Sequence, residues 1–556
     1  MKVLTMSDTA AEFKSKFPKK MLVWTALAIA VFAVTYWQAF YFNEKFNLDP
    51  GMLSIIRVLL GLMLIVTWAG WAFFFARHRL VGLLILLVPA GVFTLYHPNF
   101  SGDIAISGLK PRFWSSSRSF AIECDDSPVT VDLNTTSPID FPQFLGPNRN
   151  AQIESVTLAD SWDTEPELLW KIGVGEGWSG FVVVNGFAIT QEQRDADECV
   201  TCYDVHTGKL VWINRNQRRH EDTMGMGKVG PRATPLVHEG LVYVTSGTGV
   251  LDCLQGSTGE LVWSADVPKL VGISQAAKTN SKGLTYTMED SNLPWGRSGS
   301  PLIFEDFVVV PAGGPATIDK QSESTAATLI AFDKKTGDEK WRGGNRPISY
   351  GSPNVATVGG IQQILLVVED WAVGHDPKTG EELWSHSWLG KSSGDANCSQ
   401  VTPVDNHRLI LSKGYNMGGE LIEVKQCDGD WLVTTLKKDP RVLKTKFTNP
   451  TIFDGHTYSL SDGYLECTQI DSFRRKWKQR GRFGNGQLLL VGDKLLVHAE
   501  SGTLKLIQAS PAGYQELASI KTIDGICWNT ICLYGDLVLV RSDLEAACFR
   551  LPTVPK

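Results

Sequence analysis

Aromatic, cationic and amide side chains recur at one kind of position in this sequence, just ahead of a short apolar segment that opens each of several similar units. Tryptophan rings can stack on a flat ligand, and arginine and amide groups can hold its anionic substituents by charge-assisted hydrogen bonds. The residues of this set are Trp178, Arg232, Arg297, Tyr350, Asn397, Gln400, Asn449, Arg482, Asn485, Trp528 and Asn529. If the units surround a common axis, this set predicts one site for a ligand or a protein partner.

The same positions also have a purely structural interpretation. Ser, Thr or Asn followed by Pro makes turns that satisfy local backbone groups, and an arginine beside such a turn can bridge neighbouring units. Both interpretations stay open, and no catalytic residue is assigned.

Two cysteines, Cys199 and Cys202, form a C-x-x-C pair. On an extended strand, this odd separation directs the two side chains to opposite faces, which disfavours a shared metal or a redox pair. Cys202, Cys253 and Cys467 occupy one repeated position that holds small residues in other units, so we expect packed thiols there.

Other polar clusters are weaker candidates for chemistry. His220-Glu221-Asp222 lies in a polar stretch from residue 214 to residue 230, which we interpret as a solvated loop. Asp395 and Asp524 are the carboxylates closest to the candidate set, but neither has a ligand motif around it. The sequence therefore predicts no metal site.

The sequence motif Thr-Gly-x-x-x-Trp, in which x is any residue, is repeated along the second part of the chain. Four clear copies span residues 207–212, 258–263, 336–341 and 379–384, and each describes a strand, a tight turn and a second strand. Four fainter copies end at Trp170, Val433, Trp477 and Glu516, which makes eight in all.

A second series of polar triplets alternates with the first, one for one. Its members are centred on Ser179, Thr234, Ser300, Ser352, Thr402, Asn449, Asn485 and Asn529. Each unit therefore predicts a four-stranded antiparallel sheet, and radial packing of eight such sheets buries their faces. We expect residues 161–556 to form an all-β, eight-bladed β-propeller, with the candidate set at one mouth of its channel.

The ends of this region predict how the ring closes. The strand that holds Trp170 has no unit in front of it, and the final unit, which ends at Leu551, lacks its last strand. We expect the first strand to complete the last blade.

The repeated phrase, its spacing and the blade count resemble the pyrroloquinoline-quinone-like (PQQ-like) repeat family. That family includes quinoprotein dehydrogenases and the non-enzymatic propeller lipoprotein of the outer-membrane β-barrel assembly machine. Residues 141–149 (FPQFLGPNR) and 230–235 (GPRATP) look like a bacterial, membrane-anchored subgroup. The resemblance implies the fold, and it is compatible with an enzyme or with a scaffold.

Three apolar stretches precede the propeller: residues 21–42, 53–76 and 80–96. Each is a candidate membrane span, although the third has only 17 residues and contains Pro89. A cleaved signal peptide is the alternative for the first stretch.

Positive charge sets the expected topology of this anchor. Lys14, Lys16, Lys19 and Lys20 precede the first span, and Arg77-His78-Arg79 separates the second from the third. The positive-inside rule then predicts a cytoplasmic tail over residues 1–20, an anchor in the lipid bilayer over 21–97, a linker over 98–160 and a periplasmic propeller. The expected location is the bacterial inner membrane.

The composition excludes one class of function. A net charge of −6, with 43 % hydrophobic and 20 % charged residues, is ordinary for a folded protein and argues against nucleic-acid binding. We favour a membrane-anchored scaffold that binds envelope proteins and needs no cofactor. The alternative is a membrane dehydrogenase that oxidises an alcohol or a sugar with PQQ and calcium.

Overall fold

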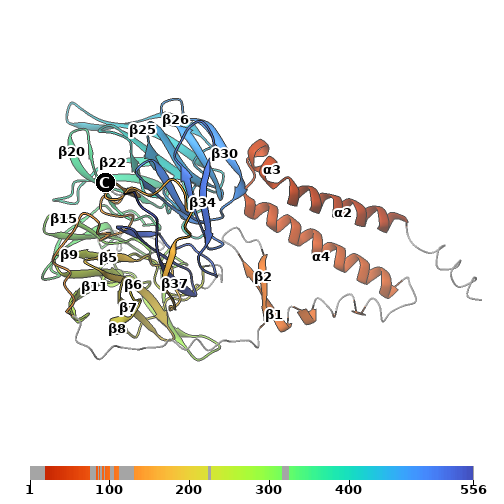
Figure 1. Cartoon of the computed structure of the whole chain (residues 1–556), viewed down its shortest axis with the longest axis horizontal. Coiled ribbons are helices and arrows are strands. Elements are labelled where there is room, and N and C mark those ends of the chain that lie inside the picture. The colour runs from red at the N-terminus through yellow and green to blue at the C-terminus, as the bar shows by residue number, and fades with distance from the viewer. Residues whose placement is uncertain are drawn as a thin grey trace, which may run out of the picture. The chain divides into compact units, whose positions relative to one another are not determined.

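The structure is a computed structural model of the chain. It describes residues 19–74, 130–222, 227–315 and 325–554, and between 83 and 111 it describes residues 83, 84, 87, 90–92, 94–100 and 106–111. Contacts divide the chain into two units, Met1–Ser117 and Arg118–Lys556, and each is described by itself (Figure 1).

Among its described residues, the first unit contains α2 (Lys19–Trp37), α3 (Ala39–Phe46), α4 (Pro50–Phe74) and a hairpin of β1 (Tyr96–Phe100) and β2 (Ile106–Pro111). Within α4, the stretch Pro50–Phe73 is strongly apolar, and most of its residues are not buried. By length and composition, this helix can cross a bilayer. The apolar part of α2, Met21–Trp37, is shorter.

Helices α2 and α4 form an antiparallel pair joined by polar contacts. Trp68 Nε1 donates to Thr25 Oγ1 at 2.7 Å, and the Arg57 guanidinium reaches the hydroxyl and carbonyl oxygens of Thr35. The one charge of α4 is therefore bound within the unit. Of the predicted span 80–96, residues 80–82, 85, 86, 88, 89 and 93 lie outside the described residues.

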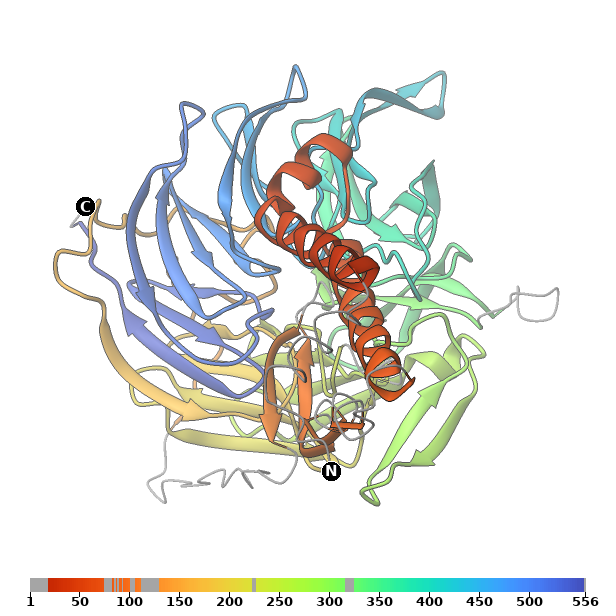
Figure 2. The ribbon, with the colours of Figure 1, turned by 90° about the vertical axis from the view of Figure 1, so that its right-hand side faces the viewer.

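The second unit contains eight antiparallel sheets arranged in a ring, which confirms the predicted propeller (Figure 2). The first four blades consist of β5 (Val182–Val184), β6 (Phe187–Arg194), β7 (Asp197–Asp204) and β8 (Leu210–Asn216); β9 (Leu236–His238), β10 (Leu241–Thr245), β11 (Val250–Gln255) and β12 (Leu261–Asp266); β15 (Leu302–Phe304), β16 (Phe307–Gly313), β17 (Ala327–Asp333) and β18 (Glu339–Gly343); and β19 (Asn354–Val358), β20 (Ile361–Val368), β21 (Trp371–His375) and β22 (Glu382–Ser387).

The remaining blades follow the same plan, with the innermost strand first in sequence. They consist of β23 (Thr402–Pro403), β24 (Arg408–Lys413), β25 (Gly418–Cys427) and β26 (Asp430–Asp439); β27 (Thr451–Phe453), β28 (His456–Ser461), β29 (Tyr464–Gln469) and β30 (Arg474–Arg482); β31 (Gln487–Val491), β32 (Lys494–His498), β33 (Thr503–Gln508) and β34 (Glu516–Lys521); and β35 (Cys532–Tyr534), β36 (Leu537–Arg541), β37 (Glu545–Arg550) and β4 (Glu167–Gly173).

The ring closes as the sequence predicts. Strand β4 pairs antiparallel with β37, with Trp170 opposite Cys548. Arg550 Nη1 also donates to Glu167 Oε2 at 2.7 Å. The eighth blade therefore combines the first and the last strands of the propeller, which leaves no open seam in the ring.

The Thr-Gly-Trp phrase recurs because it joins one blade to the next. The Trp212 ring lies 2.5 Å from the point where a Cβ atom would sit at Gly259 of the following blade, and Trp263 lies 2.6 Å from the equivalent point at Gly337. These glycines have φ values of +74° and +76°, in the left-handed region. Only glycine both adopts that turn without strain and leaves room for the ring.

The residue across the sheet from each repeated tryptophan is small. Cys202 faces Trp212, Cys253 faces Trp263 and Cys467 faces Trp477, while Ala331 and Gly374 hold this position in two other blades. All three thiols are buried, and the nine cysteines within the described residues are free. The prediction of packed thiols is confirmed.

Candidate functional site

One mouth of the propeller channel is lined by a belt of polar residues that joins the blades. Each belt residue lies two positions before an innermost strand, and the eight are Gly180, Thr234, Ser300, Ser352, Gln400, Asn449, Asn485 and Thr530. At four of the blade-to-blade joints, the backbone N–H of one belt residue donates to the side-chain oxygen of the next. The bonds run from Gly180 to Thr234 (3.3 Å), Thr234 to Ser300 (3.0 Å), Ser300 to Ser352 (3.0 Å) and Gln400 to Asn449 (2.6 Å).

This belt explains the triplet series and corrects it in the fifth blade. There Thr402 and Pro403 already belong to strand β23, and Gln400 takes the belt position. The polar triplets are therefore, at least in part, joints between blades, because their side chains satisfy backbone groups that would otherwise be buried without a partner.

An aromatic group occupies the seam between the eighth and first blades at this mouth. Trp178 and Trp528 have ring centroids 4.5 Å apart, and Phe447 lies 5.1 Å from Trp528. The Lys228 ammonium stands 5.8 Å from the Trp178 ring and pairs with Asp543. Two predicted site residues are thus brought together, but their rings contact each other.

The guanidinium of Arg232 is held by backbone carbonyls of the chain itself. It donates to the carbonyl oxygens of Trp295 and, at 2.8 Å, of Gly227. Burial lowers the pKa of Arg232 to about 10. Trp295 in turn contacts Tyr350, with ring centroids 5.6 Å apart.

Arg297 is only 3 % exposed and forms a buried ion pair with Glu289 at 3.2 Å. Its Nη1 donates to the carbonyl oxygen of Ala312 at 2.7 Å. Glu289 is the last residue of β14 (Thr285–Glu289) in an inserted segment, so this arginine fastens the insertion to the third blade.

The other predicted site residues also have partners in the chain. Tyr350 donates to the Ser392 carbonyl at 3.1 Å, and burial raises its pKa. Asn397 donates to the carbonyls of Val368 and Trp388. Arg482 is exposed, and its guanidinium lies 5.5 Å from the Tyr464 ring.

Several buried polar atoms of this mouth have no protein partner within the described part of the chain. They are Arg297 Nη2, Asn397 Oδ1, Asn485 Nδ2, Trp528 Nε1 and Asn529 Oδ1. Donors and acceptors are mixed, which is the pattern that ordered water satisfies in protein interiors.

The insertion before the third blade packs on the stretch that leads into the second blade. It contains α6 (Val267–Leu270) and the hairpin of β13 (Gln275–Thr279) and β14 (Thr285–Glu289). Thr287 N donates to the Arg219 carbonyl at 3.0 Å, and Asn280 Nδ2 donates to Glu221 Oε2 at 2.8 Å. Every residue of β13 is exposed. The insertion therefore presents β13 on the mouth side.

The stretch around His220 is buried, so our interpretation of it as a solvated loop is wrong. Arg219, His220 and Asp222 are 7 %, 8 % and 7 % exposed, because the inserted hairpin packs over them. Burial lowers the pKa of His220 to about 3. Near it, burial raises the pKa of Glu198 to about 8, although the carboxylate accepts from Gly247 N.

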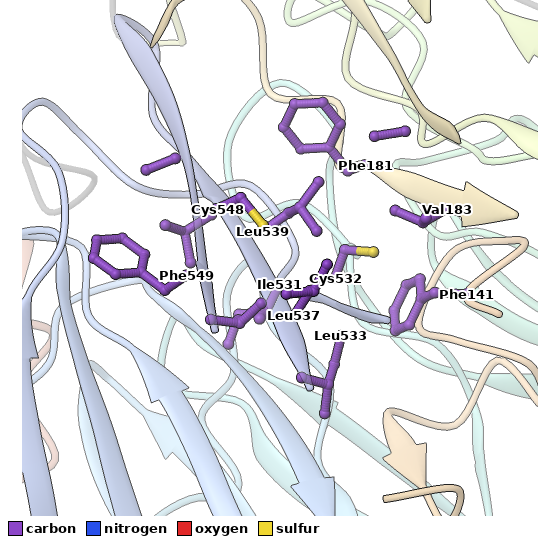
Figure 3. Close-up of a cluster of buried hydrophobic side chains, with 14 of the residues drawn as sticks. Phe141, Phe181, Val183, Ile531, Cys532, Leu533, Leu537, Leu539, Cys548 and Phe549 are labelled. Carbon is purple, nitrogen blue, oxygen red and sulfur yellow. The ribbon is translucent and has the colours of Figure 1, made fainter. Parts of the chain in front are cut away.

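Residues 130–160 fill the space between the inner strands. Phe141 exchanges two backbone hydrogen bonds with Val183 of β5, and β3 (Gln152–Ile153) pairs in parallel with β31. Phe141 is fully buried beside Val183 and Cys532, as Figure 3 shows. We call residues 141–153 the plug segment.

The centre of the plug segment is Arg149, which is 3 % exposed. Its guanidinium donates to the carbonyl oxygens of Pro301 (2.8 Å), Ser300 (3.3 Å) and Pro353 (3.1 Å) and to the side chain of Gln143. Burial lowers its pKa to about 9. One arginine thus joins the entries of the third and fourth blades, and the sequence alone did not reveal it.

The groups at this mouth do not fit a quinone cofactor with calcium. The rings of Trp178 and Trp528 contact each other at an angle of 38°, and Arg232 and Arg297 are bound to protein oxygens. Asp395 and Asp524 form ion pairs with Lys413 and Lys521, each at 3.2 Å, so each carboxylate already has a cationic partner. No group of three His, Cys, Asp or Glu side chains meets anywhere among the described residues.

Parts of this chain are similar to known proteins. Residues 196–367 match the family model of the outer membrane protein assembly factor BamB. The 1-butanol dehydrogenase (quinone) of Thauera butanivorans is 24 % identical over 189 residues, which is 32 % of this chain and 26 % of that protein. The dehydrogenase subunit of the quinone alcohol dehydrogenase of Acetobacter aceti is 25 % identical over 164 residues, or 24 % and 22 % of the two chains.

The matched region spans about a quarter of the length of these two relatives. Among solved structures, the quinohemoprotein alcohol dehydrogenase ADHIIG of Pseudomonas putida HK5 has a TM-score of 0.50 and 13 % sequence identity, over 78 % of this chain and 84 % of that one. This likeness concerns the fold. Together with the repeat and the eight blades, the match over residues 196–367 shows that this chain is a PQQ-like β-propeller.

Proposed function

We propose that this protein is a membrane-anchored β-propeller that binds other proteins of the cell envelope and works as a scaffold. In this proposal α2 and α4 hold the chain in the inner membrane, and the propeller stands on the periplasmic side. The observation that carries the proposal is the plug segment, whose Arg149 occupies the space between inner strands of the third and fourth blades.

The internal contacts of the predicted site support a binding surface rather than a catalytic centre. We expected these arginines and tryptophans to bind a flat anion. They instead contact the blades, the insertion and one another. Such contacts rigidify a surface, and a rigid surface loses little conformational entropy when a partner binds.

The mouth side also offers a surface that a partner can reach. Strand β13 is exposed along its whole length, and in the described structure it pairs only with β14. A free strand edge has unpaired backbone donors and acceptors, which a second protein can use to add a strand. The hairpin is thus our candidate epitope.

A pair of photo-crosslinking variants tests the scaffold proposal in cells of the native host. A crosslinking amino acid at Ala277 of β13 should give a discrete adduct. A second crosslinking amino acid at Trp528 should also give an adduct, which deletion of residues 275–289 should abolish. The matched control is Asp306, which is 84 % exposed in the turn at the opposite end of the third blade. Equal labelling from Ala277 and Asp306 would mean that the mouth side is not an epitope.

A PQQ-dependent dehydrogenase is the second candidate function, because both curated relatives are quinone dehydrogenases. The contacts at the mouth speak against it, since the groups that would hold the quinone and calcium are engaged elsewhere. Binding of PQQ by the full chain is the measurement that separates the two functions.

A further inference from the structure

The outermost strand of the sixth blade is far more basic than its counterparts. Strand β30 carries six cationic side chains in nine residues and no carboxylate: Arg474, Arg475, Lys476, Lys478, Arg480 and Arg482. The outermost strands of the other seven blades have at most two cationic side chains each, and their formal charges lie between −1 and +1. The outermost strands of the other blades therefore serve as the reference for the charge of β30.

Protection of a free strand edge does not explain this charge. Lysine or arginine on an edge strand discourages edge-to-edge aggregation, but one charge is commonly enough. Strand β22 has no lysine or arginine and β34 has one lysine, although each is the outer edge of its blade. The sixth blade shares their geometry, so its extra charge needs another reason.

Half of these cations serve the propeller itself. Arg475 pairs with Glu466 at 3.0 Å, and the Lys478 and Arg482 groups stand over the Tyr464 ring. Arg474, Lys476 and Arg480 are exposed, as is Arg482, but among the described residues they have neither of these two kinds of contact. Across the described residues, no ion pair joins these three to an acidic side chain. They form the set that a partner can use.

The neighbourhood of this set favours an anionic bilayer over an acidic protein. Protein interfaces are built around buried aromatic or aliphatic anchors. On the described surface of the propeller, no exposed large apolar side chain belongs to β30, and its Trp477 is packed between Tyr458 and Tyr514. Lipid headgroups need only charge, and about 30 Å of extended strand can meet many of them.

We propose that β30 binds the anionic phospholipid headgroups of the membrane in which the chain is anchored. This inference rests on the proposed membrane anchor. Arg474, Lys476 and Arg480 make the contact, and each exposed cation should increase binding to an anionic surface about five-fold. The interaction is electrostatic, so it should weaken as salt screens the charges.

Lysine acetylation of the full chain in lipid nanodiscs tests the proposal. A water-soluble reagent is applied to discs of phosphatidylglycerol and to discs of phosphatidylcholine, and mass spectrometry follows Lys476. We expect Lys476 to react at least five-fold more slowly in phosphatidylglycerol, and 0.5 M NaCl should remove the difference. Lys335 and Lys378, which are exposed in other blades, should react equally in both discs.

A double variant and a soluble polyanion complete the test. R474Q/R480Q should weaken binding to phosphatidylglycerol about 25-fold and so remove the protection of Lys476, while K335Q/K378Q leaves it unchanged. Equal acetylation of Lys476 in both discs overturns the inference, as does protection by polyglutamate without protection by phosphatidylglycerol, which would indicate an acidic protein. Failure of the chain to enter either disc would contradict the anchor itself, so the two failures are distinguishable.

Discussion

The guanidinium of Arg149 donates a hydrogen bond to the carbonyl oxygen of Pro301 at 2.8 Å, which ties the segment before the propeller to the entry of its third blade. The same group reaches Pro353 in the fourth blade. One side chain of the protein thus fills, between two blades, space in which a ligand of the channel would otherwise bind. Arg149 is accordingly a structural residue in our interpretation.

Replacing this arginine should therefore destabilise the propeller. Arg149→Leu leaves the carbonyls of Ser300, Pro301 and Pro353 buried without a donor, and each such group costs about 1 to 3 kcal/mol. We expect the free energy of unfolding in urea to fall by about 3 kcal/mol or more. Arg550→Leu, at a side chain that is 44 % exposed, is the control and should change it by less than about 1 kcal/mol. Similar losses in both variants would contradict the role of Arg149.

The contact between each tryptophan and the next blade can be separated from the strain of its turn. Gly259→Ala should cost about 2 to 4 kcal/mol, because the new methyl group meets the Trp212 ring and the backbone keeps a positive φ. Gly455→Ala has a φ of +69° and open space around the new atom, so it should cost only about 1 to 2 kcal/mol. Thermal unfolding compares the two, and equal costs would mean that the ring contact contributes nothing.

The ion pair between Arg297 and Glu289 distinguishes a structural arginine from a ligand-binding one. Arg297→Gln should lower the free energy of unfolding by about 3 to 5 kcal/mol, because Glu289 is left buried without its partner. The double variant E289Q/R297Q should recover part of this loss. If Arg297→Gln leaves stability unchanged, the arginine is not an internal fastener and its role as a binding residue gains support.

Ionisation of Glu198 gives the stability a pH dependence of known sign. Its pKa is about 8 in the folded chain, against 4.5 in the unfolded chain, so the folded state binds more protons between these values. Stability therefore decreases as the pH rises from about 4.5 to about 8, by on the order of 4 kcal/mol from this group. Glu198→Gln should remove that decrease. Parallel stability curves for the two proteins between pH 5 and pH 8 would contradict the burial of an ionisable Glu198.

Closure of the ring makes the N-terminal strand indispensable. A chain that begins at residue 181 loses both β4 and the plug segment, so the edge of β37 is left open. We expect this chain to aggregate, whereas a chain that begins at residue 118 should keep a melting temperature close to that of the intact protein. Circular dichroism on heating checks both. Equal melting would mean that β4 does not complete the eighth blade.

The repeat was predictable from the sequence because tryptophan holds one position in six of the eight blades. Trp170 could be assigned to the last blade by counting, since the final unit lacked a strand. The plug segment could not be found in this way. Its contacts are single hydrogen bonds from a non-repeating sequence to carbonyls far along the chain, such as that of Pro353, and no periodicity marks them.

The candidate site was harder to predict than the fold for a related reason. The sequence shows that Arg297 stands near the mouth, but not that Glu289 of an insertion meets it. Gln400 was included in the candidate set but not recognised as the belt residue of its blade. The Thr402-Pro403 pair, two residues later, resembles the triplets of the other blades. Side-chain partners from different blades decide these cases, and one sequence does not reveal them.

Titration of the full chain in detergent with PQQ and calcium tests the central claim most directly. We expect no saturable change in the absorbance of the quinone and no dye-linked oxidation of alcohols or sugars, because Trp178, Trp528, Arg232 and Arg297 are bound to other groups of the protein. Saturable binding of PQQ accompanied by turnover, and lost in Trp528→Ala, would contradict the claim and identify the mouth as a catalytic site.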